Sequence, residues 1–362
     1  MNSEDKGAAF EPGWLPFIIG GLPYKDPEGA WQAVLRHFPH IPSWPQLPRR
    51  DRHENMYVQF SERFPGINIG ERIRVVPDDA LDEELRRLYL AYLEDELDYG
   101  RMSPSYAAGL DLLREDEISF PRTPLALKGE VTGPISWGLT VVDETQRPVL
   151  YDEVLADAVS KHLRLKAAWQ EREMRKKAPQ TIMIVNEPYM ASFGSAFVSL
   201  SQAQVVELLV EVLADLKGLK GVHCCGNTDW SLMLRAPVDI ISFDAYDYAE
   251  NLSQYAGEIG EFLDEGGMLA WGIVPAGVTS ESETVETLVT RLHDGIHQLS
   301  KNGVSEEAIL QSGFVTPSCG LGSLSTGLVD HILDLTIAVS QEMRACYVDV
   351  DSVEDEEEAD GE

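Results

Sequence analysis

The segments Thr181 to Pro188 (TIMIVNEP) and Gly221 to Asn227 (GVHCCGN) decide the fold, with the stretch Gln202 to Lys217 between them. Both segments are short apolar runs that end in polar or turn-forming residues, which is typical of strands. The stretch between them repeats its apolar residues at the spacing of an amphipathic helix. This order of strand, helix and strand predicts an α/β fold.

The same alternation continues on both sides of this unit. Six more strands are predicted, at Pro16 to Pro23, Ser43 to Pro48, Leu125 to Pro134, Val238 to Tyr246, Met268 to Gly277 and Ala308 to Gly320. Further helices are predicted at Ala80 to Asp98, Tyr151 to Lys177, Glu283 to Ser300 and Gly327 to Arg344. Eight strands with intervening helices and no linker predict a single (β/α)8 barrel of the TIM type. A doubly wound open sheet is the alternative, although the Gly-x-Gly-x-x-Gly pattern of its dinucleotide-binding version is missing.

We expect three parts in the chain: a short irregular N-terminal extension at residues 1–15, one barrel domain at residues 16–346, and an acidic tail at residues 347–362. From Asp349 to Glu362 there are nine acidic residues and no basic one, which predicts a disordered tail. The formal net charge of the whole chain is −32, which argues against nucleic acid as a partner. Adaptation of the host to salt is another source of such acidity.

The composition also bears on the cellular compartment. No apolar run approaches the length of a membrane span, and the first residues, MNSEDKGAAF, lack the basic and apolar regions of a signal peptide. Four cysteines, two of them adjacent, do not make a disulfide framework. The sequence therefore predicts a cytoplasmic protein without membrane contact.

Three residues with metal-binding side chains stand near the ends of predicted strands. His223 and Cys225 form a His-x-Cys pair, and Cys319 follows about a hundred residues later in VTPSCGLGS. One imidazole and two thiolates favour zinc, and three protein ligands leave a position open for substrate. The alternative is that these residues are buried without a ligand role, since free cysteines are often small core hydrophobes. Asp244, at the end of the next strand, is either a fourth ligand or a helix cap.

Other polar residues at strand ends are candidates for substrate binding. Asn186 and Glu187 follow an apolar strand, and Glu130 lies close to the turn Gly133-Pro134. The Gly20-Gly21 pair can bring backbone N–H groups to a carboxylate, or form a plain turn. Arg50 belongs to the basic cluster Arg49 to His53, which either binds an anionic substrate group or neutralises neighbouring acids.

The motifs GGLP, WPQLP, KGEVTGP, NEPYMASFGS, HCCGN, SFDAY and TPSCGLGS occur in this order. In that order they resemble the catalytic barrel of cobalamin-independent methionine synthase, within the wider uroporphyrinogen decarboxylase and methionine synthase superfamily. The resemblance runs from Phe17 to Arg344. Its most specific part is His-x-Cys followed by Pro-x-Cys-Gly-Leu.

The resemblance implies a zinc ion held by His223, Cys225 and Cys319, with Asp244 at or near the position of the family's glutamate. It implies an enzyme that transfers a methyl group to a small-molecule thiol, homocysteine, to give methionine. The zinc would turn the thiol into a thiolate nucleophile at neutral pH.

Three departures from the family pattern bear on the substrates. Asn186 stands where the family has an aspartate that holds the amino group of homocysteine, and an amide brings no charge. Arg49 and Arg50 stand where the family has a Gly-Glu motif. The strand from Trp271 to Pro275 lacks the family's proton-relay histidine.

The missing histidine favours a methyl-corrinoid as donor, because a methyl group on cobalt leaves without protonation whereas the nitrogen of methyltetrahydrofolate requires an acid. A corrinoid protein is then an expected partner. The alternatives are a decarboxylase of the uroporphyrinogen type, a methyltransferase of the methylcobamide:coenzyme M type, and a non-catalytic relative that binds zinc or a corrinoid.

Overall fold

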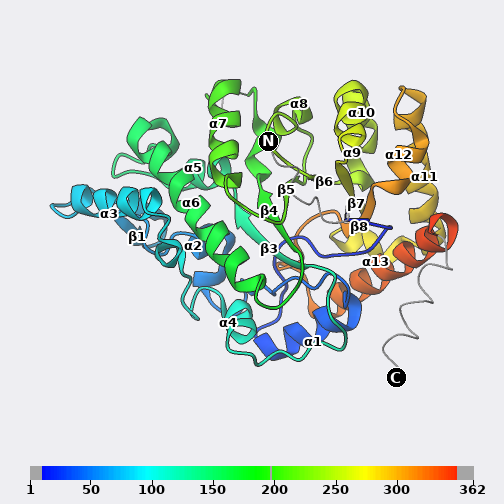
Figure 1. Cartoon of the computed structure of the whole chain (residues 1–362), viewed down its shortest axis with the longest axis horizontal. Helices are drawn as coiled ribbons and strands as arrows, with labels where there is room; N and C mark the ends of the chain where they lie inside the picture. Colours follow the sequence, from blue (N-terminus) through cyan, green and yellow to red (C-terminus); the bar gives the residue numbers. More distant parts are fainter. Residues whose placement is uncertain (1–9, 196–197, 349–362) are drawn as a thin grey trace, which may run out of the picture.

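The computed structural model describes residues 10–195 and 198–348, and a curled parallel sheet forms its centre (Figure 1). Six strands lie in sequence order: β3 (Leu127–Thr132), β4 (Thr181–Asn186), β5 (Leu219–Cys224), β6 (Ile240–Phe243), β7 (Met268–Val274) and β8 (Gly313–Pro317). Each strand pairs in parallel with the next. A separate antiparallel pair, β1 (Ile67–Ile69) and β2 (Ile73–Val75), lies beside helix α3 (Leu81–Leu93) at the left of Figure 1.

The larger helices cover the outside of the sheet. Among the described residues they are α1 (Pro27–His37), α4 (Ala108–Arg114), α5 (Pro134–Thr140), α6 (Glu153–Met174), α7 (Gln202–Leu213), α9 (Ala245–Leu252), α10 (Ala256–Asp264), α11 (Val285–Lys301) and α13 (Thr326–Tyr347). Three are single turns or little more: α2 (Met56–Gln59), α8 (Trp230–Met233) and α12 (Glu306–Gln311). All five predicted helices are present, with ends shifted by a few residues.

The predicted strand Ala308 to Gly320 is wrong in its first part. Residues before β8 form helix α12, because Ser305 caps it through a hydrogen bond from the Ala308 N–H group, and acidic residues fill its first turn. Helix α1 was not predicted, although Asp26 and Pro27 form a recognisable helix start.

The two N-terminal strands of the predicted barrel are not formed as strands. Pro16 makes an isolated bridge to Val315 on one edge of the sheet, and Ser43 makes one to Lys128 on the other edge. A hydrogen bond of 2.8 Å from Leu22 N to Gln46 O joins the two segments. Pro16 and Pro23 bound the first segment, Pro45 and Pro48 lie in the second, and a proline has no N–H group to continue a ladder. The sheet is therefore a six-stranded half-barrel, compatible with a TIM-type barrel, and the described residues do not show eight strands.

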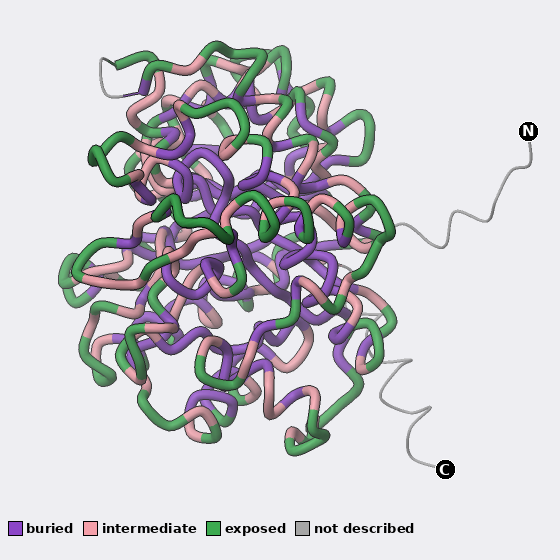
Figure 2. The backbone as a smooth tube through the Cα atoms, turned by 90° about the vertical axis from the view of Figure 1, so that its left-hand side faces the viewer, coloured by how far each residue is buried: buried purple, intermediate pink, exposed green. Residues whose placement is uncertain are grey.

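Side chains on the concave face alternate along each strand and fall into two layers. Apolar residues fill the end where the strands begin, as in Ile184, Ile240 and Phe314, which belong to one buried cluster. Two residues further along each strand the side chains are polar: Asn186, Ser242 and Thr316. Figure 2 shows the buried backbone running through the middle of the molecule. The carboxyl ends of the strands thus carry a buried polar layer.

Residues 1–15 were predicted as an irregular extension, and the described part of this segment, residues 10–15, packs on the rest of the fold. Trp14 is fully buried, its N–H group donates to Gly313 O at 2.8 Å, and its ring leaves no room for a side chain at Gly313. Residues 1–9 and all but the first two residues of the predicted tail lie outside the described residues. No helix in the described part of the chain is long and apolar enough to cross a membrane.

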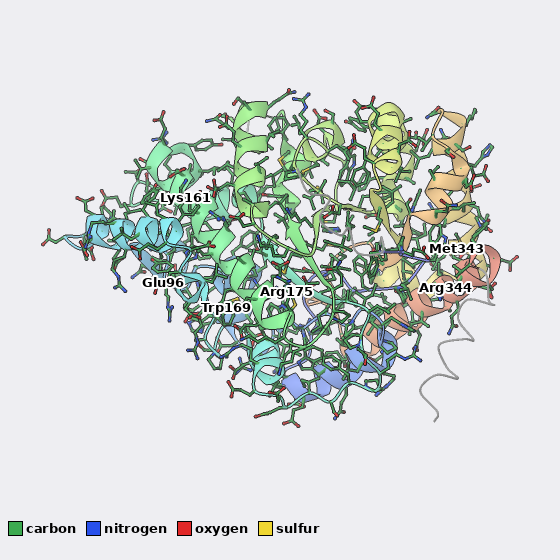
Figure 3. The ribbon with its side chains drawn as sticks, in the orientation of Figure 1. Glu96, Lys161, Trp169, Arg175, Met343 and Arg344 are labelled. Atoms are coloured by element: carbon green, nitrogen blue, oxygen red, sulfur yellow. The ribbon has the colours of Figure 1, made fainter. Side chains whose placement is uncertain are left out.

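We predict that residues 349–362 are dispensable and that the end of α13 is not. Met343 is fully buried, and Arg344 donates a 2.6 Å hydrogen bond to Gly13 O (both are labelled in Figure 3). Deletion of residues 349–362 should leave the free energy of unfolding unchanged, because nine of the fourteen residues removed are mutually repelling acids. Deletion of residues 343–362 should lower it by about 2–5 kcal/mol, as expected for loss of a buried methionine. Urea denaturation of both proteins measures this, and a large loss in the shorter deletion would contradict the prediction.

Candidate metal centre

Parallel pairing brings the predicted site residues to one edge of the sheet. Asn186 lies opposite His223 in the register of β4 and β5, and His223 lies opposite Ser242 in the register of β5 and β6. Cys225 follows the last residue of β5, and Cys319 follows β8 by two residues. Because β5 and β8 are separated by two strands, the curl of the sheet is what brings the two cysteines together.

The three predicted metal ligands form one group. The ligand atoms of His223, Cys225 and Cys319 all lie within 4.8 Å of one another. Nδ1 of His223 is 2.8 Å from Ser242 Oγ, while its Nε2 is buried and has no hydrogen-bond partner. When Nδ1 donates to the serine, Nε2 carries a free lone pair, and a buried atom of that kind is rare without a ligand. One nitrogen and two sulfur donors therefore fit a zinc ion.

The two thiols are coupled to each other. The Cys319 thiol hydrogen-bonds to Cys225 and lowers the pKa of Cys225, and the same interaction, with burial, raises the pKa of Cys319. Cys224 points to the other side of the strand, as strand alternation predicts, and burial raises its pKa to about 12. Cys346 is exposed near the end of α13.

Asp244 lies beside the metal group but is not part of it. Its Oδ1 accepts a hydrogen bond from Asp247 N at 3.0 Å, so Asp244 is the N-cap of helix α9. Burial raises the pKa of its carboxyl group to about 6, and the charges of His223 and Asp247 act on it in opposite directions. The geometry therefore gives Asp244 a capping role, and its role as a ligand stays a prediction.

Glu130 is the centre of a buried polar network. Its carboxylate accepts hydrogen bonds from Asn186 Nδ2 at 2.6 Å and from Gly20 N at 2.9 and 3.0 Å, and it pairs with the fully buried Lys128. Burial alone would raise the pKa of Glu130, but Lys128 and these hydrogen bonds hold it below its usual value. Glu130 thus positions Asn186 and Gly20 rather than facing the pocket.

Glu187, also a predicted substrate ligand, is turned toward helix α5. Its oxygens accept hydrogen bonds from Ile135 N at 2.9 Å, Ser136 N at 2.8 Å and Ser136 Oγ at 2.6 Å. These are the free N–H groups of the first helical turn, which a carboxylate satisfies. Burial raises the pKa of Glu187 to about 7 against the effect of these bonds. Its contacts with the described residues are those of a structural cap.

A pocket of ≈ 510 Å³ opens above the metal group. Of the predicted site residues, Gly20, Gly21, Asn186, His223, Cys225 and Cys319 line it. Arg50 is not among the lining residues: its Nη1 lies 2.7 Å from Oε1 of the buried Glu54, which requires a counter-charge. Its neighbour Arg49 lines the pocket instead and donates to Ser323 O.

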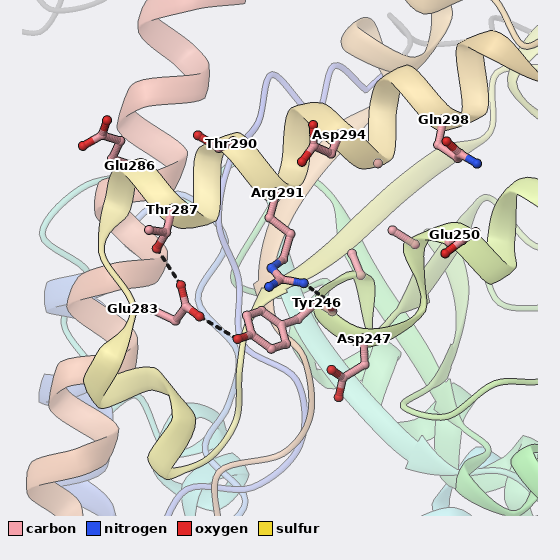
Figure 4. A pocket seen from close by; sticks show the side chains of 13 residues that line it. Tyr246, Asp247, Glu250, Glu283, Glu286, Thr287, Thr290, Arg291, Asp294 and Gln298 are labelled. Carbon is pink, nitrogen blue, oxygen red and sulfur yellow. Dashed lines mark hydrogen bonds between the residues drawn. The ribbon is translucent and has the colours of Figure 1, made fainter.

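A second hollow, of ≈ 870 Å³, lies outside the sheet between helices α9 and α11 (Figure 4). There the Arg291 guanidinium stacks 4.2 Å above the Tyr246 ring, and Tyr246 donates to Glu283 at 2.6 Å. None of the predicted site residues lines this hollow. The metal group therefore belongs to the pocket at the strand ends.

Sequence reasoning missed two residues of the site, Lys128 and Ser242, and it named Arg49 in a basic cluster from which it selected Arg50. Lys128 and Glu130 are two residues apart on a predicted strand, so their side chains lie on the same face. Opposite charges at this spacing are a signal for a buried ion pair. Ser242 precedes Asp244 by two residues and shares its strand face. No signal distinguishes Arg49 from Arg50, because the choice depends on Glu54.

No protein-family model and no curated protein matches this chain. Solved structures match it over most of its length. A B12-independent methionine synthase from Shewanella sp. W3-18-1, in complex with selenomethionine, has a TM-score of 0.58 at 16% identity and covers 92% of this chain and 98% of that chain. A putative vitamin-B12 independent methionine synthase from Listeria monocytogenes has a TM-score of 0.52 at 11% identity, covering 91% and 97%.

A methyltransferase from Methanosarcina mazei has a TM-score of 0.51 at 12% identity, covering 90% of this chain and 94% of that chain. At such identities the similarity shows the fold. The chain has a fold like that of these methionine synthase structures, which confirms the fold that the resemblance of its motifs implied.

We predict one zinc ion per chain, lost when either thiol is removed. Cys225→Ser and Cys319→Ser should each abolish stoichiometric zinc, because serine oxygen is a poor replacement for thiolate. Cys346→Ser, at an exposed position, is the matched control and should retain the metal. Metal analysis of protein purified without added metal measures the content, and circular dichroism checks the fold. Full zinc in the Cys319→Ser protein would refute the assignment.

Two variants of Asp244 distinguish the effect of its negative charge on zinc binding from its effect on stability as the N-cap of helix α9. Asp244→Asn keeps a good N-cap, so the free energy of unfolding should not change, whereas Asp244→Ala should lower it by about 1 kcal/mol. Both variants should weaken zinc binding by about 10- to 100-fold if the carboxylate holds or orients a ligand. Competition with a zinc chelator measures the affinity. Unchanged affinity in both variants would leave Asp244 a purely structural cap.

Proposed function

We propose that this protein is a zinc-dependent methyltransferase that transfers a methyl group to the sulfur of a small thiol. The observation that carries the proposal is the buried, unpartnered Nε2 of His223 beside two thiols under a pocket. The similarity of the fold to structures named methionine synthase and methyltransferase supports it. On this proposal the segments 16–23 and 43–48 act as the first two strands of an eight-stranded barrel.

The residues of the centre fit their proposed roles. His223, Cys225 and Cys319 would hold the zinc, and Ser242 would fix the ring of His223 through Nδ1. A bound zinc ion lowers the pKa of a thiol that coordinates it, so that the thiol is a nucleophile at neutral pH. Three protein ligands leave room for that thiol. Homocysteine is the acceptor that the family resemblance suggests.

The composition of the pocket supports a donor that needs no proton. Among the described residues that line it, no carboxylic acid is present, and His223 is the one histidine. His223 is already assigned to the metal, so no general acid faces the space where a methyl donor would bind. A methyl-corrinoid, free or on a corrinoid protein, fits such a pocket better than methyltetrahydrofolate. A cytoplasmic location is part of the proposal, because the thiols must remain reduced.

The alternative decarboxylase function has less support. A substrate with several carboxylates requires several cations in the pocket. Arg50 is paired with Glu54, and Arg52 donates to Gly70 O outside the pocket, which leaves Arg49. That function would also leave the His223 and cysteine group without a role.

We predict that methylcobalamin outperforms methyltetrahydrofolate as donor. Without a positioned acid, transfer from folate loses a contribution of about 10²- to 10⁴-fold, whereas transfer from cobalt loses none. The test incubates zinc-loaded protein with each donor and a panel of thiols, and measures the methyl thioether by mass spectrometry. The Cys319→Ser protein is the control and should be inactive. Turnover with the folate alone would overturn the choice of donor, and activity with neither would favour a non-catalytic relative.

A further inference from the structure

Two residues that line the pocket above the metal group, the charged Arg49 and the neutral Asn186, can bind polar groups of a substrate. We infer that the acceptor is an anionic thiol whose second polar group is a neutral hydrogen-bond donor, such as a hydroxyl, rather than an ammonium group. Arg49 would bind the anion and Asn186 the neutral donor. The inference rests on the proposed thiol methylation and specifies the substrate class of the same pocket.

Arg49 supplies the attraction for the anion. Among the described lining residues it carries the one permanent charge, and the remaining lining is neutral or apolar apart from the metal group. One of its nitrogens donates to Ser323 O, in the loop that follows Cys319. A guanidinium has five N–H donors, so others stay available to a carboxylate at the pocket mouth.

Asn186 presents a hydrogen-bond acceptor whose orientation is fixed. Its Nδ2 donates to Glu130 at 2.6 Å, and a carboxylate accepts only from the NH2 side of an amide. Oδ1 therefore points away from Glu130, and it is buried without a partner in a residue that lines the pocket and is 8% exposed. A buried acceptor without a partner requires a donor from the ligand or from water.

The surroundings of Asn186 do not provide a counter-charge for an ammonium group. The carboxylate to which Asn186 donates, that of Glu130, is already neutralised by its ion pair with Lys128. An ammonium group placed against Asn186 Oδ1 would lose its water and gain no opposite charge, which is unfavourable for a buried ion. A hydroxyl group makes the same hydrogen bond without that desolvation penalty.

The test compares thiols that differ in one substituent. Homocysteine, 2-hydroxy-4-mercaptobutyrate and 4-mercaptobutyrate carry an ammonium, a hydroxyl and a hydrogen at the same carbon, and 4-mercaptobutan-1-ol lacks the anion. Their dissociation constants are measured with cobalt-substituted protein from the thiolate-to-cobalt absorption, and with zinc protein by calorimetry. We expect the hydroxy acid to bind about tenfold more tightly than homocysteine and than the alcohol.

Variants assign each preference to its residue. Arg49→Gln should remove most of the preference for 4-mercaptobutyrate over the alcohol, while Arg52→Gln, an exposed arginine bonded outside the pocket, should leave it unchanged. Asn186→Ala should remove the preference for 2-hydroxy-4-mercaptobutyrate over 4-mercaptobutyrate, because it removes the acceptor for the hydroxyl group. Metal content, measured in each variant, shows that the centre is intact.

The outcomes separate this inference from the proposed function. If homocysteine binds more tightly than the hydroxy acid, or if Arg49→Gln retains the anion preference, the inference is wrong while the thiol-binding metal centre stands. If no thiol changes the cobalt spectrum, both the inference and the proposed function fail. The predicted order of affinities, altered in the stated directions by the two pocket variants, would support it.

Discussion

The site depends on the contacts that the buried carboxylate of Glu130 makes. It joins three parts of the chain, since it accepts from Gly20 in the N-terminal segment, pairs with Lys128 on its own strand and accepts from Asn186 on β4. An ionised carboxylate in this interior requires all of these partners, and loss of one charge of a buried pair typically costs about 3–5 kcal/mol. The network also fixes the turn at Gly20, whose φ of +68° and whose contact with Gly320 leave no room for a side chain. The loop of Cys319 is thereby held against the N-terminal segment.

The other acidic residues at the strand ends stabilise helices instead of facing a substrate. Glu187 satisfies the first turn of α5, and Asp244 satisfies the first turn of α9. Parallel strands lead toward helices at this edge, so acceptors at these two strand ends satisfy free N–H groups of first helical turns. Once these acceptors are assigned, the imidazole of His223 and the two thiols remain as a group of possible metal ligands. The fold therefore separates structural carboxylates from soft metal ligands at the same edge of the sheet.

The sequence predicted the parts of this molecule that depend on short-range pattern. The spacing of apolar residues gave the six strands of the sheet and the long helices, and the His-x-Cys pair with Cys319 gave the metal group that the curl of the sheet assembles. It failed at the segments 16–23 and 43–48, which make isolated bridges to the sheet instead of strands, and where a helix start preceded β8. It also chose Arg50 over Arg49, because adjacent arginines look alike in sequence and Glu54, a folded-state neighbour, decides between them. The residue pattern of one segment carries no information about the contacts that this segment makes with distant segments.

The charge of the pocket and the charge of the whole protein act at different distances. The chain carries a formal net charge of −32, yet the pocket at the strand ends is lined by neutral residues and Arg49. At physiological ionic strength charges are screened beyond about 8 Å, so the distant acidic surface has little effect on a ligand already in the pocket. It does repel an approaching anion, and this repulsion grows as the salt concentration falls. Binding of an anionic thiol would therefore be decided by Arg49 once the ligand arrives, while its rate of arrival would increase with salt.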